Sequence, residues 1–259
     1  MVPAPPAYRP RTGLRIIVAL TSVGMIAMNA LANIVPFFGR GTGEVSALYP
    51  TLVTPAGYVF AIWGVIYIGL IVYSIAQFTG HLAEDPLPDL LAWPLIISNV
   101  ANVIWLLLWH SLNIYWTVPF MLALLTSLIV AYLLARAGRP EQPTAREAWT
   151  VRVPLGVYLG WVSVATIANI AGALVAASWG GFGIPAAWWG LLVLFVATAL
   201  AFANLVRVGD CVFAGVFVWA LAGIAVATSS ASVQLVAGAF AVLIGIGMLV
   251  SAFTRRRLV

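Results

Sequence analysis

The stretch from Tyr49 to Tyr67, YPTLVTPAGYVFAIWGVIY, places a proline-containing loop directly before a long apolar segment. Pro50 and Pro55 each lack an amide donor and favour extended geometry in the preceding residue, so they exclude helix from most of the loop. From Tyr58 onward, no residue is expected to break a helix. The stretch therefore predicts a loop that leads into an apolar helix.

Aromatic side chains recur within that predicted helix. Phe60, Trp63 and Tyr67 stand at i, i+3 and i+7. An α-helix places such residues on one face, because it has 3.6 residues per turn. We therefore expect this face to form one wall of a flat slot.

The whole chain has the composition of an integral membrane protein. Of its 259 residues, 63% are hydrophobic and 7% are charged, and the mean hydropathy is +1.08. All twelve basic residues are arginines. The pI near 9.8 therefore reflects the positive flanks of membrane helices, and a groove for nucleic acid is not expected. Cys211 is the only cysteine, which excludes an internal disulfide and a thiolate-rich metal site.

Eight apolar runs are each long enough, at about 20 residues, to cross a bilayer. They fall roughly at residues 14–37, 56–78, 90–110, 115–136, 153–175, 186–206, 211–229 and 233–253. The predicted fold class is all-α, a polytopic membrane bundle of about eight helices. The connections between the last three runs are short, so the boundary between the sixth and seventh is the least well defined.

The arginines predict the orientation of the bundle, because positive flanks are retained in the cytoplasm. With the amino terminus inside, eleven of the twelve arginines are cytoplasmic and only Arg40 lies outside. Both termini are then cytoplasmic. The alternative for the first run is a signal peptide cleaved near Ala30-Leu31-Ala32, which would leave the other helices oriented as before.

The predicted membrane interior contains no ionisable side chain. Acidic residues and arginines fall in loops or at helix ends, which argues against a proton-coupled pump with a buried carboxylate. His81 and His110 are expected on opposite membrane faces, so they would not share a metal ion. No nucleophile, acid–base pair or metal site is visible, and no catalytic residue is assigned.

The interior instead carries asparagine and aromatic residues at helical spacings. These stripes are Asn29 and Asn33 in the first run, Asn102, Trp105 and Trp109 in the third, and Tyr158, Trp161, Ala165 and Asn169 in the fifth. At 1.5 Å per residue, several of these side chains lie roughly 8 to 12 Å below the outer surface. Such a cluster fits a pocket beneath the loop from Phe38 to Pro55. The alternative is that the asparagines only join helices and the tryptophans form an interfacial belt.

Three segments resemble motifs of a known family. The run Thr54-Pro55-Ala56-Gly57-Tyr58-Val59-Phe60, followed by Trp63 and Tyr67, resembles the first-loop and second-helix signature of the translocator protein family, which includes tryptophan-rich sensory proteins and peripheral benzodiazepine receptor relatives. Asn102 with Trp105 is similar to that family's third-helix Asn-x-x-Trp. Residues 158–169 are similar to its fifth-helix motif.

The chain also departs from the family pattern. Val157 replaces the fifth-helix proline, Leu106 and Leu107 stand where prolines often follow the third-helix tryptophan, and one residue is missing before Trp63. The resemblance covers approximately residues 14–177, and residues 29–50 resemble a longer bacterial branch with extra helices. We therefore expect a five-helix bundle at 1–177 and a three-helix extension at 178–259, in the bacterial cytoplasmic membrane.

The resemblance implies a receptor or sensor that binds a planar hydrophobic ligand under a first-loop lid. A protoporphyrin-like tetrapyrrole is the first candidate, and sterols or carotenoid-like molecules are the next; no cofactor is required. The expected ligand-binding residues are Asn29, Asn33, Tyr58, Phe60, Trp63, Tyr67, Asn102, Trp105, Trp109, Tyr158, Trp161, Ala165 and Asn169, with Tyr58 at the lid hinge. A transporter of such molecules and a photo-oxidative porphyrin-degrading enzyme remain alternatives.

Small residues suggest how the extension is held. Gly156 and Gly160 form one row, and Ala237, Ala241 and Gly245 form another. Such rows let helix backbones approach closely, so we expect them to dock the extension on the bundle. If the extension covers the surface that shorter relatives use for self-association, the protein is a monomer in membrane lipid, and a homodimer is the alternative.

Reporter fusions at the two termini test the predicted orientation. Both fusions are expected to report a cytoplasmic location, because that orientation keeps eleven arginines inside. A reporter at Arg40 provides the control and should report the opposite side. A periplasmic carboxyl terminus would contradict the eight-span topology.

Overall fold

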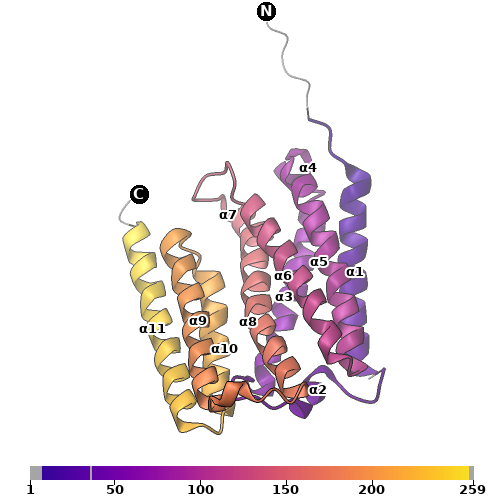
Figure 1. Cartoon of the computed structure of the whole chain (residues 1–259). Helices are drawn as coiled ribbons and strands as arrows, with labels where there is room; N and C mark the ends of the chain where they lie inside the picture. Colours follow the sequence, from indigo (N-terminus) through magenta and orange to yellow (C-terminus); the bar gives the residue numbers. More distant parts are fainter. Residues whose placement is uncertain (1–7, 36, 257–259) are drawn as a thin grey trace, which may run out of the picture.

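The computed structural model describes residues 8–35 and 37–256, and all regular secondary structure in these ranges is helical. The long helices lie side by side, and the first turn of α1 and the last turn of α11 lie at the same end (Figure 1). The described chain therefore crosses the bundle an even number of times. The prediction of an all-α polytopic bundle is confirmed.

The long helices follow the eight predicted runs. They are α1 (Thr12–Ile34), α3 (Ile62–Ala76), α5 (Leu87–His110), α6 (Ile114–Leu134), α8 (Val153–Ala176), α9 (Ala186–Arg207), α10 (Cys211–Ala227) and α11 (Ala231–Arg256). Short elements in the connections are α2 (Thr42–Leu48), α4 (His81–Glu84), α7 (Ala145–Glu147) and η3 (Gly181–Gly183), and the π-helical turn η2 (Ala148–Arg152) precedes α8. Seven helices of the described chain are long and apolar enough to cross a membrane. The 17 residues of α10 span only about 25 Å, so the helix of the seventh predicted run is shorter than expected.

The start of the second long helix differs from the prediction. A 3₁₀ turn, η1 (Gly57–Ala61), precedes α3, so the α-helix begins at Ile62 and not at Tyr58. A long-range contact accompanies the tighter turn, because Trp219 Nε1 of α10 donates to the Val59 carbonyl at 3.0 Å. Trp219 lies 160 residues from Val59, so no local sequence pattern indicates this contact.

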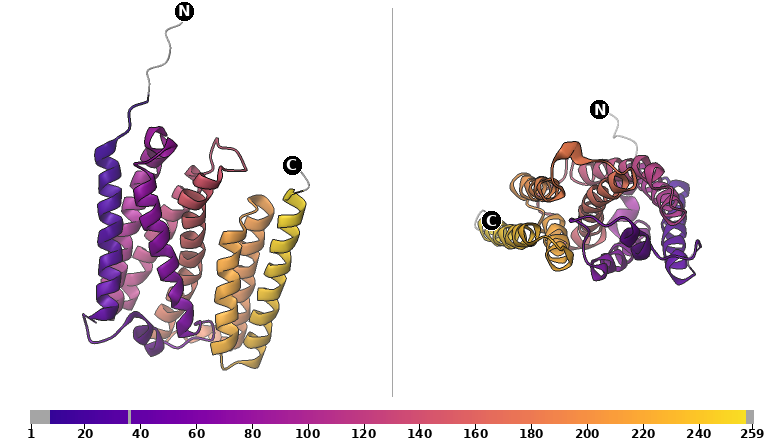
Figure 2. Two further views of the ribbon diagram at one scale, coloured as in Figure 1. Left: turned by 180° about the vertical axis from the view of Figure 1, so that it is seen from behind. Right: turned by 60° about the horizontal axis from the view of Figure 1, so that its bottom comes forward.

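The helices form two groups. In the five-helix bundle, α5 packs on α1 and α6, and α8 packs on α6 and α3. The second group, α9 to α11, lies to one side of that bundle (Figure 2). Helix α10 joins the groups, because it packs on α8 as well as on α9 and α11.

Two glycines of α8 allow α10 to approach. A Cβ on Gly160 would lie 3.0 Å from Val216 Cβ and 3.1 Å from the Phe213 carbonyl oxygen, and a Cβ on Gly156 would lie 3.1 Å from Asp210 Oδ2. This row of glycines therefore faces the extension, as expected. The α11 row behaves differently: α11 packs mainly on α9 and α10, and a Cβ on Gly245 would have no neighbour within 4 Å.

Asp210 ties both groups together at the end of the bundle that carries the termini. Its carboxylate accepts hydrogen bonds from Tyr132 Oη at 2.8 Å and Arg136 Nη2 at 2.7 Å. It also caps α10, where it accepts from the amides of Val212 and Phe213 at 3.0 Å. Burial lowers the pKa of the Arg136 guanidinium, while Tyr132 and Asp210 oppose that effect. One carboxylate thus joins α6 to the start of α10.

Arg15 plays a similar part within the five-helix bundle. Its side chain is buried and pairs with Asp89 at 2.7 Å. The guanidinium also donates to the carbonyls of Gln77, Leu82, Ala83 and Asp85 at 2.8 to 2.9 Å. These bonds satisfy carbonyls at the end of α3 and in the connection to α5. Arg15 therefore joins α1 to α3 and to the start of α5.

Replacing Asp210 tests the joint between the groups. We expect Asp210→Ala to lower the free energy of unfolding by about 3 kcal/mol, because it leaves Arg136 without its carboxylate and removes the α10 cap. Asp210→Asn, which keeps an acceptor for the cap, should cost about 1 kcal/mol. Chemical denaturation in detergent measures both values. The exposed Glu84 provides the control as Glu84→Ala, and an Asp210→Ala variant as stable as this control would contradict the assignment.

Candidate functional site

An aromatic cavity lies beneath the connection between α1 and η1. This connection is at the end of the bundle opposite the termini (Figure 1). We call residues 38–55 of this connection the lid. The cavity is lined by Thr42, Ser46, Tyr49, Thr54 and Pro55 of the lid, Phe60 and Trp63, Trp105 and Trp109 of α5, and Trp161, Val164, Ala165, Ala168, Asn169 and Gly172 of α8. This lining, drawn from the described residues, contains no charged side chain.

Ring contacts join the walls of the cavity. Trp161 lies edge-on to Phe60 and Trp63, with ring centroids 5.7 and 6.3 Å apart. On α5, Trp105 and Trp109 are stacked at 5.6 Å. Aromatic pairs at these separations contribute about 0.5–1.5 kcal/mol each beyond the area that they bury. The walls therefore form a rigid aromatic surface.

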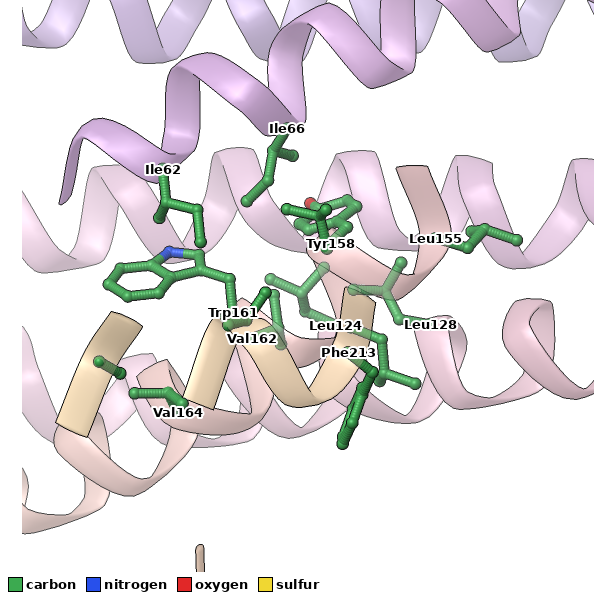
Figure 3. Packing of buried hydrophobic residues seen from close by; sticks show 14 of the residues in the cluster. Ile62, Ile66, Leu124, Leu128, Leu155, Tyr158, Trp161, Val162, Val164 and Phe213 are labelled. Carbon is green, nitrogen blue, oxygen red and sulfur yellow. The ribbon is translucent and has the colours of Figure 1, made fainter. Parts of the chain in front are cut away.

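The predicted stripe of side chains on α8 faces α3, the second long helix. Figure 3 shows Trp161 and Tyr158 on α8 directed toward Ile62 and Ile66 of α3. Tyr158 is fully buried, and its ring lies 6.1 Å from that of Trp63. Successive turns of α8 therefore pack against successive turns of α3.

Three buried polar atoms on cavity-lining residues have no hydrogen-bond partner among the described residues. They are the indole nitrogens of Trp105 and Trp161 and the Oδ1 atom of Asn169. These side chains are only 6%, 2% and 3% exposed. Asn169 Nδ2 donates to Thr117 Oγ1 at 2.8 Å, which leaves its carbonyl oxygen as the unpaired acceptor. Each unpaired buried group costs about 1–3 kcal/mol, so the residues around the cavity carry two unpaired donors and one unpaired acceptor.

The lid is closed over these groups. Trp109 Nε1 donates to the Thr42 carbonyl at 3.1 Å, and Thr42 Oγ1 is hydrogen-bonded to His110 Nε2 at 3.0 Å. The enclosed volume is about 50 Å³. Pockets for drug-sized ligands hold about 300–1,000 Å³. A large ligand therefore does not fit the cavity in this closed arrangement.

The predicted site residues fall into three sets. Seven line the cavity: Phe60, Trp63, Trp105, Trp109, Trp161, Ala165 and Asn169. Four lie behind this lining: Tyr67 and Tyr158 against Trp63, and Asn29 and Asn102, which are hydrogen-bonded to each other at 2.7 Å. Asn33 and Tyr58 are outside the lining: Asn33 Nδ2 donates to the Asn29 carbonyl, and Tyr58 is half exposed and packs on Trp219.

Other lining residues were not predicted from the sequence. Val164, Ala168 and Gly172 lie on the same face of α8 as Trp161, so helical spacing was a usable signal for them. Thr42, Ser46 and Tyr49 stand at i, i+4 and i+7 on and after α2, but their segment carries no apolar periodicity that predicts a helix.

Metal-binding side chains do not cluster within the described residues. Within residues 8–35 and 37–256, no three His, Cys, Asp or Glu side chains are close enough to hold one. The cavity walls offer aromatic rings, indole donors and an amide oxygen, which suit an organic molecule.

Comparison with protein families gives an identity for this arrangement. A family model described as TSPO-like protein matches residues 15–250. The match continues beyond residue 177, where the motif resemblance ends, and includes α9, α10 and most of α11. No curated protein and no solved structure matches the chain. Because the match spans most of its length, the chain belongs to the TSPO-like protein family.

Proposed function

We propose that this protein is a membrane receptor or sensor for a planar hydrophobic ligand, bound in the aromatic cavity beneath the lid. A tetrapyrrole of the protoporphyrin type is the first candidate, with sterol-like and carotenoid-like molecules next. Family membership supports a membrane sensor, receptor or transporter of hydrophobic ligands. The choice of a tetrapyrrole is what the family resemblance implies, and the chemistry of the cavity supports it.

The observation that carries this proposal is the set of unpaired polar atoms on aromatic walls. Trp105 and Trp161 offer indole N–H donors, and Asn169 offers an amide acceptor. A flat molecule that carries both acceptors and N–H or O–H donors would satisfy them while its faces stack on the rings. A purely hydrocarbon ligand would leave all three groups unpaired, so a tetrapyrrole fits better than a carotene.

Ligand binding requires a larger cavity than the closed one. Because the closed volume is about 50 Å³, the lid and its Thr42 contacts must shift before a tetrapyrrole enters. The ligand would then replace the bonds that Thr42 makes with Trp109 and His110. With both termini in the cytoplasm of a bacterium, as we propose, the lid faces the outside of the cytoplasmic membrane.

A titration of purified protein in lipid nanodiscs with protoporphyrin IX tests the site. Removing two rings in Trp63→Leu/Trp161→Leu should weaken binding about 30-fold, because two contacts of about 1 kcal/mol each are lost. Trp161→Phe keeps a ring but removes the indole donor, and should weaken binding about fivefold. Protoporphyrin absorbance and fluorescence report the affinity without relying on the remaining tryptophans.

Trp116→Leu provides the matched control, because Trp116 is 66% exposed and lies outside the cavity lining. Its affinity should equal that of the unmodified chain. Equal affinity in the double variant and this control would place the ligand elsewhere. Ligand flux across vesicles would instead identify a transporter, and consumption of protoporphyrin under light and oxygen would identify an enzyme.

A further inference from the structure

Two hydrogen bonds connect α10 to the segment that follows the lid. We call residues 56–61, which include η1, the hinge segment. The amide of Ala56 donates to the Gly223 carbonyl at 3.1 Å, and Trp219 Nε1 donates to the Val59 carbonyl at 3.0 Å. Both bonds end on backbone atoms of the hinge segment, so they fix the course of the chain and not merely one side chain.

Packing at Gly223 reinforces these bonds. A Cβ added to Gly223 would lie 2.2 Å from Val59 Cγ2 and 3.4 Å from Pro55 Cβ. Val59 is fully buried, so it has little room to yield. On the neighbouring turn, the Trp219 ring lies edge-on to Tyr58 with centroids 5.4 Å apart. The hinge segment therefore lies against α10 at contact distance.

The residues just before the hinge segment are also held by the extension. Val53 is buried and lines a small void together with α9 and α10 residues. A Cβ on Gly190 of α9 would lie 3.7 Å from both Leu52 Cβ and Val53 Cγ1. The second half of the lid thus packs on α9 and α10.

The first half of the lid is held differently. Thr42 is bonded to the side chains of Trp109 and His110, both on α5, and Val45 is the one α2 residue that is fully enclosed. Releasing Thr42 breaks these two hydrogen bonds and the 3.4 Å bond from its amide to Asn33 Oδ1, none of which involves α9 or α10. Opening at α2 therefore disturbs fewer packed groups than opening at the hinge segment.

We propose that Trp219 and Gly223 are positioning residues for the ligand site, which hold the hinge segment fixed while the lid opens at α2. Held in this way, Phe60 stays against Trp161 at 5.7 Å, and the wall that meets the ligand is complete before the ligand arrives. The inference rests on the proposed function, because it assigns a role in the proposed ligand cavity. It gives the carboxyl-terminal helices a part in ligand binding.

Hydrogen exchange of the full chain in nanodiscs, without ligand, tests the fixed hinge. In the unmodified protein, peptides covering residues 56–61 should exchange more slowly than peptides covering 42–49. Trp219→Phe, which removes one hydrogen bond but keeps a ring, should accelerate exchange of the hinge peptides about fivefold. Gly223→Ala, which displaces Val59, should accelerate it at least as much. Exchange of the α2 peptides should stay unchanged.

Gly215→Ala is the matched control, because it adds the same methyl group to α10 where only Met248 Cε lies nearby, at 3.5 Å. Hinge exchange in this variant should equal that of the unmodified chain. Equal exchange in Gly223→Ala and Gly215→Ala, or hinge peptides that exchange faster than α2 in the unmodified chain, would overturn the proposal. If Gly223→Ala does not fold, Trp219→Phe decides the question by the same measurement.

Protoporphyrin dissociation adds a readout that a purely structural role would not change. At an unchanged melting temperature, Trp219→Phe should release protoporphyrin several-fold faster than Gly215→Ala, because Phe60 and its wall lose their support. Failure of all variants to bind protoporphyrin would overturn the proposed function, and the exchange data would then decide the hinge by themselves. Slow hinge exchange with equal dissociation rates would overturn the positioning role.

Discussion

The close approach of α8 and α10 is the contact on which the rest of the arrangement depends. It exists because Gly156 and Gly160 present bare backbone to Asp210 and Val216. In a membrane, helices gain little from burying apolar surface against one another, so close packing and interhelical hydrogen bonds must supply the association energy. A side chain at either glycine would separate the two helices.

That contact has consequences at both ends of α10. At one end it brings Asp210 within reach of Tyr132 on α6 and of Arg136 just after that helix. At the other end it brings Gly223 against the segment that carries Phe60. A single helix of 17 residues therefore links a polar cluster near the termini to the wall of the cavity. Both links depend on α10, which lies outside the five-helix bundle.

Local periodicity predicted much of this structure and seven of the fifteen residues that line its cavity. The stripes on α5 and α8 were visible because helical spacing fixes which side chains share a face. Tyr58, expected as a ligand-binding residue at the lid hinge, lies outside the cavity lining, because η1 is a 3₁₀ turn held by Trp219, a partner 160 residues away. The lid residues Thr42 and Ser46 were missed, because α2 forms on the bundle and not from its own apolar pattern.

Residues around the closed cavity carry unpaired buried polar atoms, which the proposed ligand would pair. Replacing Trp161 by phenylalanine or Asn169 by leucine would remove unpaired buried polar atoms, each of which costs about 1–3 kcal/mol. An apolar ring or aliphatic side chain would fill the space without that cost, and buried groups away from the cavity, such as Gln77 Oε1 and Asn99 Oδ1, are unpaired as well. In our proposal, a ligand that enters when the lid opens would supply the missing hydrogen bonds. The cost of the unpaired groups in the closed state would then add to the free energy of binding, because the proposed ligand would remove that cost.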